Sequence, residues 1–364
     1  MSDTDFMRGA LALARRGLGQ TAPNPSVGCV IVNKGRVAGR GFTAPGGRPH
    51  AEVIALREAG EQARGGTAYV TLEPCSFIGK TGPCTQELIS AGISRVVLGA
   101  RDPHPKVNGS GIAQLKSAGI SVTENVLRQE CEAVIAGFAT VQREQRPLLR
   151  LKLATSLDGR IATSGRESKW ITSPQARRAV HAMRGRHDAV LTGVGTVLAD
   201  DPELTCRIDG FRTEPLVRVV VDSHLRTPLL SRLVRSASEH PLWILYRDGA
   251  DRLRRRALED AGAKLLELPG STAGVDLRAS MAALAREGIT RVLAEGGGTL
   301  AAGLLRAGLV DRISWFHAPC IIGGDGYPAA QAFGISLLED APRFALVFSE
   351  RLGYDMLSQF KRVE

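Results

Sequence analysis

The sequence predicts two α/β domains in one chain. Segments patterned as buried strands alternate with segments of helical periodicity along most of the 364 residues, which is typical of layered α/β folds. The length exceeds the size at which one hydrophobic core usually stops growing, and therefore favours about two domains. Charged residues, a proline and a new apolar segment meet at "REQRPLLRLKL". We therefore expect the domains to span 1–146 and 147–364.

In the first domain, a helical apolar pattern opens the chain, and two short strands joined by a turn at "NKG" follow. Helices and strands then alternate up to the expected boundary. The expected helices are 3–19, 50–60, 84–92, 110–119 and 129–142, and the expected strands are 27–32, 35–42, 67–72, 94–100 and 120–126.

The second domain repeats this alternation. The expected strands are 148–156, 188–193, 216–223, 241–246, 289–297 and 311–319, and the expected helices are 173–186, 252–262, 277–288 and 298–308. The sequence contains no short-period repeat and no low-complexity segment, which excludes solenoid and disordered architectures.

Composition and charge narrow the class of protein. The chain is 43% hydrophobic and 23% charged, as ordinary globular proteins are. Its net charge of +10 divides into an excess of five basic residues on each side of the expected boundary. This even distribution suits pockets for anionic small molecules, so we expect no nucleic-acid partner. No run of about 18 apolar residues occurs, and the acidic start lacks a cleavage pattern, so we expect a cytoplasmic protein without a membrane partner.

Two cysteines, Cys75 and Cys84, flank a glycine-rich turn in "TLEPCSFIGKTGPC" and could form a disulfide, a redox pair, a metal site or two inert thiols. Six scattered cysteines in a long chain are unlike a secreted disulfide framework. Upstream, His50 and Glu52 stand at an expected helix start. One imidazole and two thiolates suit zinc, and a carboxylate beside the metal can carry protons. The pattern is typical of zinc deaminases, with Glu52 as the catalytic residue.

Four segments resemble the deaminase half of the bifunctional riboflavin-biosynthesis family, which joins a diaminohydroxyphosphoribosylaminopyrimidine deaminase to a 5-amino-6-(5-phosphoribosylamino)uracil reductase. They are "TAPNPSVGCVIV", "PHAEVIALREAG", "TAYVTLEPCSFIGKTGPC" and "ISRVVLGARDPHPKVNGSGI". The resemblance implies a cytidine-deaminase-like three-layer α/β/α fold with one zinc ion. It also implies that Asn24 contacts the pyrimidine, although Asn24 alone could be a turn residue. Phe77 and Ile78 stand where the family usually carries a histidine or another polar or aromatic pair.

The second half has two features of its own. Lys152 lies on an expected strand, and Glu295 ends another strand before three glycines that open a helix. Backbone N–H groups at such a helix start can cradle an anion, although the glycines alone could equally form a turn. The run is not the dinucleotide-binding G-x-G-x-x-G fingerprint.

The segments "SKWITSPQARRAVHAMRGRHDAVLTGVGTVLADDPELTCR", "VVVDSHLRTP" and "EGGGTL" resemble the reductase half of the same family. This implies a dihydrofolate-reductase-like α/β fold that binds NADPH. The cofactor would contact Ala154, Trp170, Thr196, Asp200, Ser223, Gly297, Gly298, Thr299, Leu300, Ala301, Ala302 and Gly303. The phosphorylated substrate would contact Lys152, Ser168, Arg184, Leu204, Arg207 and Glu295.

The leading hypothesis is therefore a zinc hydrolase fused to an NADPH-dependent oxidoreductase of riboflavin biosynthesis. The guanidinium forks of Arg184 and Arg207 suit a phosphate, and Lys152 or Glu295 could assist opening of the sugar. An RNA-editing deaminase joined to an RNA-binding module and a zinc-stabilised scaffold are the alternatives. We expect a homo-oligomer, a dimer or a tetramer, and strands 291–297 and 311–319 could support a dimer through the second domain.

Overall fold

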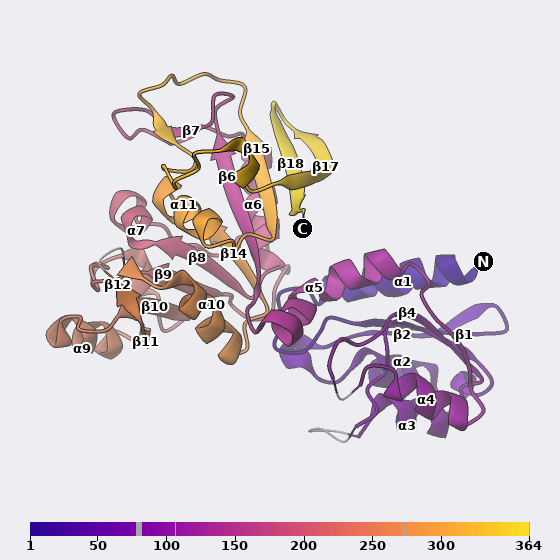
Figure 1. The fold of residues 1–364 in the computed structure, drawn as a ribbon. Coiled ribbons are helices and arrows are strands. Elements are labelled where there is room, and N and C mark those ends of the chain that lie inside the picture. The colour runs from indigo at the N-terminus through magenta and orange to yellow at the C-terminus, as the bar shows by residue number, and fades with distance from the viewer. Residues whose placement is uncertain (78–81, 106, 272–273, 364) are drawn as a thin grey trace. The chain divides into compact units, whose positions relative to one another are not determined.

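The computed structural model describes residues 1–77, 82–105, 107–271 and 274–363 (Figure 1). These residues form two compact units, Met1–Gln145 and Arg146–Glu364. Ile78 of the zinc-loop prediction lies outside the described residues. Within the described ranges, none of the helices has both the length and the apolar character that a membrane span needs.

The first unit is built on a five-stranded sheet of order β2-β1-β3-β4-β5, in which β1 is antiparallel to both neighbours and β3, β4 and β5 are parallel. Its strands are β1 (Gly28–Asn33), β2 (Arg36–Phe42), β3 (Thr67–Leu72), β4 (Arg95–Ala100) and β5 (Ser121–Thr123). Its helices are α1 (Asp3–Arg16), α2 (Ala51–Ala59), α3 (Cys84–Ser90), α4 (Ser110–Ser117) and α5 (Arg128–Glu144).

Glycines let two helices approach this sheet closely. A Cβ on Gly28 would lie 1.9 Å from the carbonyl oxygen of Ala10 in α1, and one on Gly41 would lie 2.2 Å from that of Ala51 in α2. Gly41 is the register partner of Cys29, so the two glycines point to opposite faces of the sheet. Helices α1 and α5 thus cover one face while α2, α3 and α4 lie on the other, which gives three layers (Figure 1).

The second unit is built on a nine-stranded sheet within the described residues, of order β11-β10-β9-β8-β14-β6-β15-β18-β17. The strands of this sheet are β6 (Leu148–Thr155), β8 (Ala189–Gly193), β9 (Val217–Val221), β10 (Leu242–Arg247), β11 (Lys264–Leu268), β14 (Arg291–Glu295), β15 (Arg312–His317), β17 (Phe344–Leu352) and β18 (Asp355–Arg362). Strands β17 and β18 pair antiparallel, and all strands from β11 to β15 in the sheet order run parallel.

Helices cover both faces of the large sheet. They are α6 (Pro174–Gly185), α7 (Val194–Asp200), α8 (Arg232–Arg235), α9 (Arg252–Asp260), α10 (Leu277–Arg286) and α11 (Gly298–Arg306). Helices α10 and α11 bury one face with Leu149 and Leu151 of β6, whereas α6 packs on Phe316 and Leu357 of the other face. Short ribbons complete the unit: β7 (Arg160–Ala162) with β16 (Tyr327–Pro328), and β12 (Gly270–Ser271) with β13 (Gly274–Val275).

The predicted α/β class is confirmed in both halves. The elements expected from the sequence do not include α7, β11, β17 or β18, although all four are regular. The strands that could support a dimer, 291–297 and 311–319, correspond to β14 and β15. Both are interior strands with a neighbour on each side, so a contact through them would not be edge-to-edge strand pairing.

Candidate functional site

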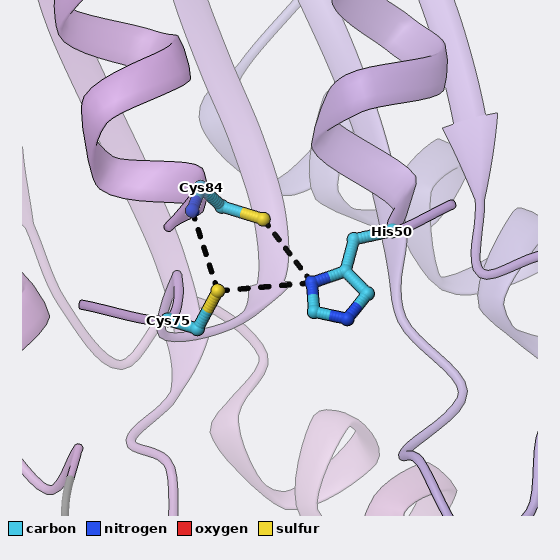
Figure 2. A group of neighbouring side chains, drawn as sticks. All are labelled: His50, Cys75 and Cys84. Atoms are coloured by element: carbon cyan, nitrogen blue, oxygen red, sulfur yellow. Dashed lines mark hydrogen bonds between the residues drawn. The ribbon is translucent and has the colours of Figure 1, made fainter. Parts of the chain in front are cut away.

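Three metal-binding side chains meet in the first unit. His50 directly precedes α2, Cys75 follows β3, and Cys84 is the first residue of α3. Figure 2 shows the three converging: the Nδ1 atom of His50 lies 3.2 Å from Cys84 Sγ and 3.7 Å from Cys75 Sγ. The backbone N–H of Cys84 also donates to Cys75 Sγ at 3.3 Å. The structure therefore brings the predicted ligands together.

The donor set and its spacing fit zinc. All three ligand atoms lie within 4.8 Å of one another. A tetrahedral zinc with bonds of about 2.0 Å to nitrogen and about 2.3 Å to sulfur holds its ligand atoms roughly 3.5–4 Å apart. Hydrogen bonds from Cys84 and from His50 lower the pKa of Cys75 to about 4, so that a thiolate stands ready at neutral pH.

Glu52 lies beside these ligands in the first turn of α2. It is 4% exposed, and burial raises the pKa of its carboxyl group. Its side chain also contacts the Cys84 thiol. A buried carboxyl group with a raised pKa, next to a metal site but outside the ligand set, can accept and return a proton near neutral pH.

His50, Glu52 and Cys75 line a pocket of about 180 Å³ that also includes Asn24 and Arg48. Asn24 donates from Nδ2 to the carbonyl oxygen of Gly47 at 3.1 Å. Gly47 has a φ of +85°, and a Cβ there would lie 2.1 Å from Asn24 Nδ2, so only glycine fits. Asn24 thus stands at the pocket and also holds the turn that carries Arg48.

Phe77 has an aromatic partner in the same pocket. Its ring stacks on that of His104, with centroids 5.7 Å apart and planes 21° apart, and both residues line the pocket wall. The stack joins the loop after Cys75 to the loop after β4. Sequence reasoning flagged Phe77 as a departure from the family but gave no role to His104.

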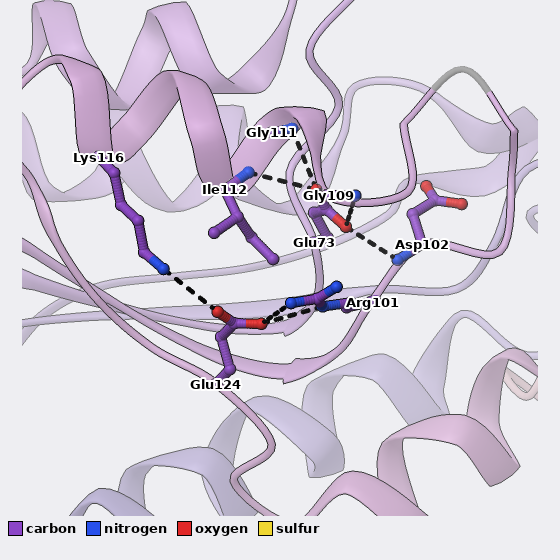
Figure 3. Close-up of polar contacts among 8 residues, drawn as sticks. All are labelled: Glu73, Arg101, Asp102, Gly109, Gly111, Ile112, Lys116 and Glu124. Carbon is purple, nitrogen blue, oxygen red and sulfur yellow. Dashed lines mark hydrogen bonds and ion pairs between the residues drawn. The ribbon is translucent and has the colours of Figure 1, made fainter.

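The pocket also contains two acidic residues, Glu73 and Asp102, to which the sequence alone assigned no role. Figure 3 shows that buried Glu73 accepts hydrogen bonds from the backbone N–H groups of Gly109, Gly111 and Ile112, at the start of α4, and from that of Asp102. Burial raises the pKa of Asp102 to about 7. Both carboxylates follow the ends of parallel strands, β3 and β4. Because ligands bind at the carboxyl ends of parallel strands, this position in the sequence could have identified them as pocket residues.

A polar cluster marks the second unit. Lys152 on β6 is the register partner of Glu295 at the end of β14. Arg184 of α6 donates to both carboxylate oxygens of Glu295, at 2.6 and 2.9 Å. Burial lowers the pKa of Lys152, and the Glu295 charge partly offsets that effect. A partly buried lysine of lowered pKa, held beside a carboxylate, is suited to giving up a proton.

The loop that follows α7 lies against this cluster. Arg184 donates to the carbonyl oxygen of Thr205 at 3.0 Å, and the backbone N–H of Arg207 donates to His181 Nδ1 at 3.2 Å. The Arg207 guanidinium pairs with Glu203 at 2.7 Å, and Leu204 is buried in the core. Sequence reasoning gave no role to His181, which faces the same loop from α6.

The residues expected to bind the cofactor follow the ends of neighbouring parallel strands. Ser223 follows β9, Thr196 and Asp200 belong to α7 after β8, and the glycine run opens α11 after β14. A Cβ on Gly297 would lie 3.9 Å from Thr196 Oγ1. The carboxyl ends of parallel strands are where open α/β sheets bind ligands.

Not all expected cofactor residues reach this edge. Ala301 and Ala302 are buried in the body of α11. Trp170 is 69% exposed and lies under the Arg177 guanidinium, 4.4 Å from it. Ser168 precedes Trp170 in the same loop, and Ala154 packs with the cluster beneath α6.

Comparisons with known proteins agree with both sites. Residues 1–100 match the cytidine and deoxycytidylate deaminase zinc-binding region, and residues 147–358 match the RibD C-terminal domain. The riboflavin biosynthesis protein RibD of Escherichia coli is 41% identical over 98% of both chains. A crystal form of Acinetobacter baumannii RibD is 36% identical, with a TM-score of 0.89 over 100% of this chain and 99% of that one.

A third relative is a protein with two named activities. The structure of a diaminohydroxyphosphoribosylaminopyrimidine deaminase/5-amino-6-(5-phosphoribosylamino)uracil reductase from Thermotoga maritima is 33% identical to this chain. Its TM-score is 0.87 over 99% of both chains. Identity above one third over the full length, with a family match across more than half of the residues, leaves one assignment: this chain belongs to the RibD family of riboflavin biosynthesis proteins.

Proposed function

We propose that the chain catalyses two successive steps of riboflavin biosynthesis. Residues 1–146 deaminate 2,5-diamino-6-(5-phosphoribosylamino)pyrimidin-4(3H)-one to 5-amino-6-(5-phosphoribosylamino)uracil. Residues 147–364 reduce the ribosyl chain of that product with NADPH, which yields 5-amino-6-(5-phosphoribitylamino)uracil. The observation that carries this proposal is the presence of a His50, Cys75 and Cys84 cluster beside buried Glu52 in one unit and a Lys152–Glu295–Arg184 cluster in the other.

In the deaminase unit, His50, Cys75 and Cys84 would hold a zinc ion, which would lower the pKa of a bound water molecule toward neutrality. Glu52 takes the proton of the attacking water and passes it to the amino group that leaves the ring carbon as ammonia. Its buried carboxyl group and raised pKa suit both directions of transfer. Asn24 fixes the pyrimidine in the pocket, and the Phe77–His104 stack forms part of the wall.

In the reductase unit, bound NADPH would supply a hydride to C1′ of the ribosyl group, with cleavage of the C1′–O4′ bond. The O4′ oxygen then needs one proton to become the hydroxyl of the open chain. Lys152 gives that proton, because burial lowers its pKa while the Glu295 carboxylate keeps the ammonium form accessible. Arg184 acts through Glu295, because its guanidinium group donates a hydrogen bond to each of the two carboxylate oxygens.

The other residues of the second unit that we propose to bind ligands contact either the substrate phosphate or NADPH. When substrate binds, the Arg207 guanidinium group leaves Glu203 and binds the substrate phosphate instead. Ser168 and Leu204 line the same site. Residues at the ends of β6, β14, β8 and β9 would hold NADPH. The contacts would come from Ala154, Trp170, Thr196, Asp200, Ser223, Gly297, Gly298, Thr299, Leu300 and Gly303, with Ala301 and Ala302 supporting the start of α11 from the core.

We further propose a homo-oligomer, a dimer or a tetramer, of a cytoplasmic enzyme with no nucleic-acid or membrane partner. Strand β17 ends the large sheet, and Leu346, Val347 and Phe348 on it are 46–59% exposed. An apolar edge strand is a ready surface for pairing with a second copy. Sedimentation of the chain and of a Val347→Lys variant tests this contact, which the variant would weaken.

One assay tests the two activities together. The chain with zinc receives the diaminopyrimidine phosphate and NADPH, and ammonia release and NADPH oxidation are followed in parallel. We expect Glu52→Gln to abolish ammonia release but to oxidise NADPH normally when the deaminated intermediate is supplied. Lys152→Met should give the opposite result. Loss of neither activity in these variants would overturn the residue assignments, and absence of both in the parent chain would overturn the function.

A further inference from the structure

Four cations share one face of the large sheet near the start of its parallel strands. Arg312 on β15 is the register partner of Arg150 on β6 and of Lys361 on β18. Arg291 on β14 is the partner of Leu148, which lies two residues before Arg150 and on the same face. These four residues are here named the basic row, and they span the adjacent strands β14, β6, β15 and β18.

Two acidic residues act on the basic row by their charge, Asp188 on Arg291 and Asp311 on Arg312, and each also accepts hydrogen bonds from groups outside the row. Asp311 pairs with Arg146 at 2.7 Å and accepts a hydrogen bond from the backbone of Leu149. Asp188 accepts hydrogen bonds from the backbone and hydroxyl of Thr290 and from the backbone of Arg291. In the part of the chain that the structure describes, Arg150, Arg312 and Lys361 form no ion pair.

Arg150 instead donates to two neutral acceptors. Its Nη1 atom lies 2.7 Å from Ser314 Oγ and 3.2 Å from Gln359 Oε1. Burial, with Arg291 and Arg312 nearby, lowers the pKa of Arg150 to about 9. Like charges held together out of water are costly unless an anion balances them.

Two buried nitrogen atoms at the basic row also lack hydrogen-bond partners among the described residues. They are Nε of Arg312 and Nε2 of His187, a residue that is only 3% exposed. His187 follows α6 and contacts the carbonyl oxygen of Met183 through Nδ1, at 2.6 Å, which leaves Nε2 for another group. The charges of Arg291 and Arg150 act on His187, which places it beside the row.

We propose that the basic row binds a phosphate-class oxyanion, either inorganic phosphate or the phosphate group of a monoester. Guanidinium groups match the oxygens of such an anion with paired, charge-assisted hydrogen bonds. Arg312 is only partly buried and Lys361 is exposed, so solvent reaches the row from the β18 side. This site is distinct from the Lys152–Glu295–Arg184 cluster, which lies nearer the ends of the same parallel strands.

Calorimetric titration of the full chain with inorganic phosphate tests the proposal. Arg312→Gln and Lys361→Gln should each weaken one phosphate site at least about tenfold, as expected when a charge-assisted hydrogen bond is lost. Arg252→Gln, which removes an exposed arginine on α9, is the matched control and should bind as the parent does. Arg207→Gln should keep this site, because it alters the substrate phosphate position instead.

A second series with ribose 5-phosphate separates the two sources of the anion. If the Arg312 and Lys361 substitutions weaken the binding of inorganic phosphate and of ribose 5-phosphate equally, the site accepts monoesters. If they weaken the binding of inorganic phosphate alone, the site binds the free ion. Unchanged phosphate binding in Lys361→Gln and Arg312→Gln would overturn the proposal. If Arg312→Gln fails to fold, the exposed Lys361 position still decides the question.

Discussion

Arg184 and Glu295 form a bidentate ion pair, with Nε and Nη2 of the arginine 2.6 and 2.9 Å from the two carboxylate oxygens. The pair joins α6 to the end of β14, beside Lys152 on the neighbouring strand. Both side chains are 10–14% exposed, so solvent screens the pair little. The charge state of Lys152 therefore depends on a carboxylate that α6 holds in place.

This relationship predicts the alkaline limb of the reductase pH profile. Lys152 gives up a proton, so NADPH oxidation should fall as pH rises through the lowered pKa of Lys152. In Glu295→Gln the carboxylate that favours the ammonium form is gone, so that pKa falls further and the alkaline limb moves to lower pH. Measurement of kcat against pH in the two proteins checks this, with exposed Glu239→Gln as the control. An unshifted limb in Glu295→Gln would exclude the proposed charge relationship.

The Phe77–His104 stack predicts an interaction between two loops of the deaminase pocket. Phe77→Ala and His104→Ala should each raise KM for the pyrimidine about tenfold, because each frees one loop of the pocket wall. A stacked aromatic pair contributes about 0.5–1.5 kcal/mol beyond burial, so the double variant should lose less than the sum of the single losses by about that amount. Fully additive effects on kcat/KM would show that the two rings act independently.

Replacement of Arg218 should lower the stability of the second unit without changing the deaminase rate. Its side chain is fully buried on β9 and donates to Ser236 Oγ at 2.7 Å and to the carbonyl oxygen of Leu233 at 3.1 Å, and it also contacts the carbonyl oxygen of His240. Arg218→Met leaves these buried acceptors unpaired and should lower the free energy of unfolding of the second unit by about 3–5 kcal/mol.

Thermal unfolding compares Arg218→Met with Arg252→Met, which removes an exposed arginine of the same unit. The deaminase rate should be unchanged in both variants, since Arg218 lies in the second unit. Equal stability of the two variants would contradict the structural role of the buried guanidinium group.

The sequence predicts the zinc cluster well because each ligand stands at a helix start or strand end whose position follows from local patterns. His50 directly precedes α2, Cys84 begins α3, and Cys75 lies three residues after the end of β3. The same reasoning misses Asp102 and His104, whose place in the pocket depends on how the loop after β4 folds onto Glu73. Such packing between distant loops leaves no periodic signal in the sequence.

The second unit shows the same limit. Glu295 and the glycines after it are marked by a strand end followed by a helix start, and the structure has both. The contact of Arg184 with Glu295 joins residues 111 positions apart, and no local pattern encodes it. The edge strand β17 was also missed, because its side chains are mostly exposed and lack the alternation of a half-buried strand.

We infer that one chain carries two chemically independent sites, of which only one needs the metal. The direct test removes zinc with a chelator and then measures each activity with its own substrate. We predict that ammonia release from the diaminopyrimidine phosphate stops and returns when zinc is restored. NADPH oxidation with the deaminated intermediate should continue at the parent rate throughout. Loss of NADPH oxidation together with ammonia release, or ammonia release that persists without zinc, would contradict a zinc requirement confined to the deaminase site.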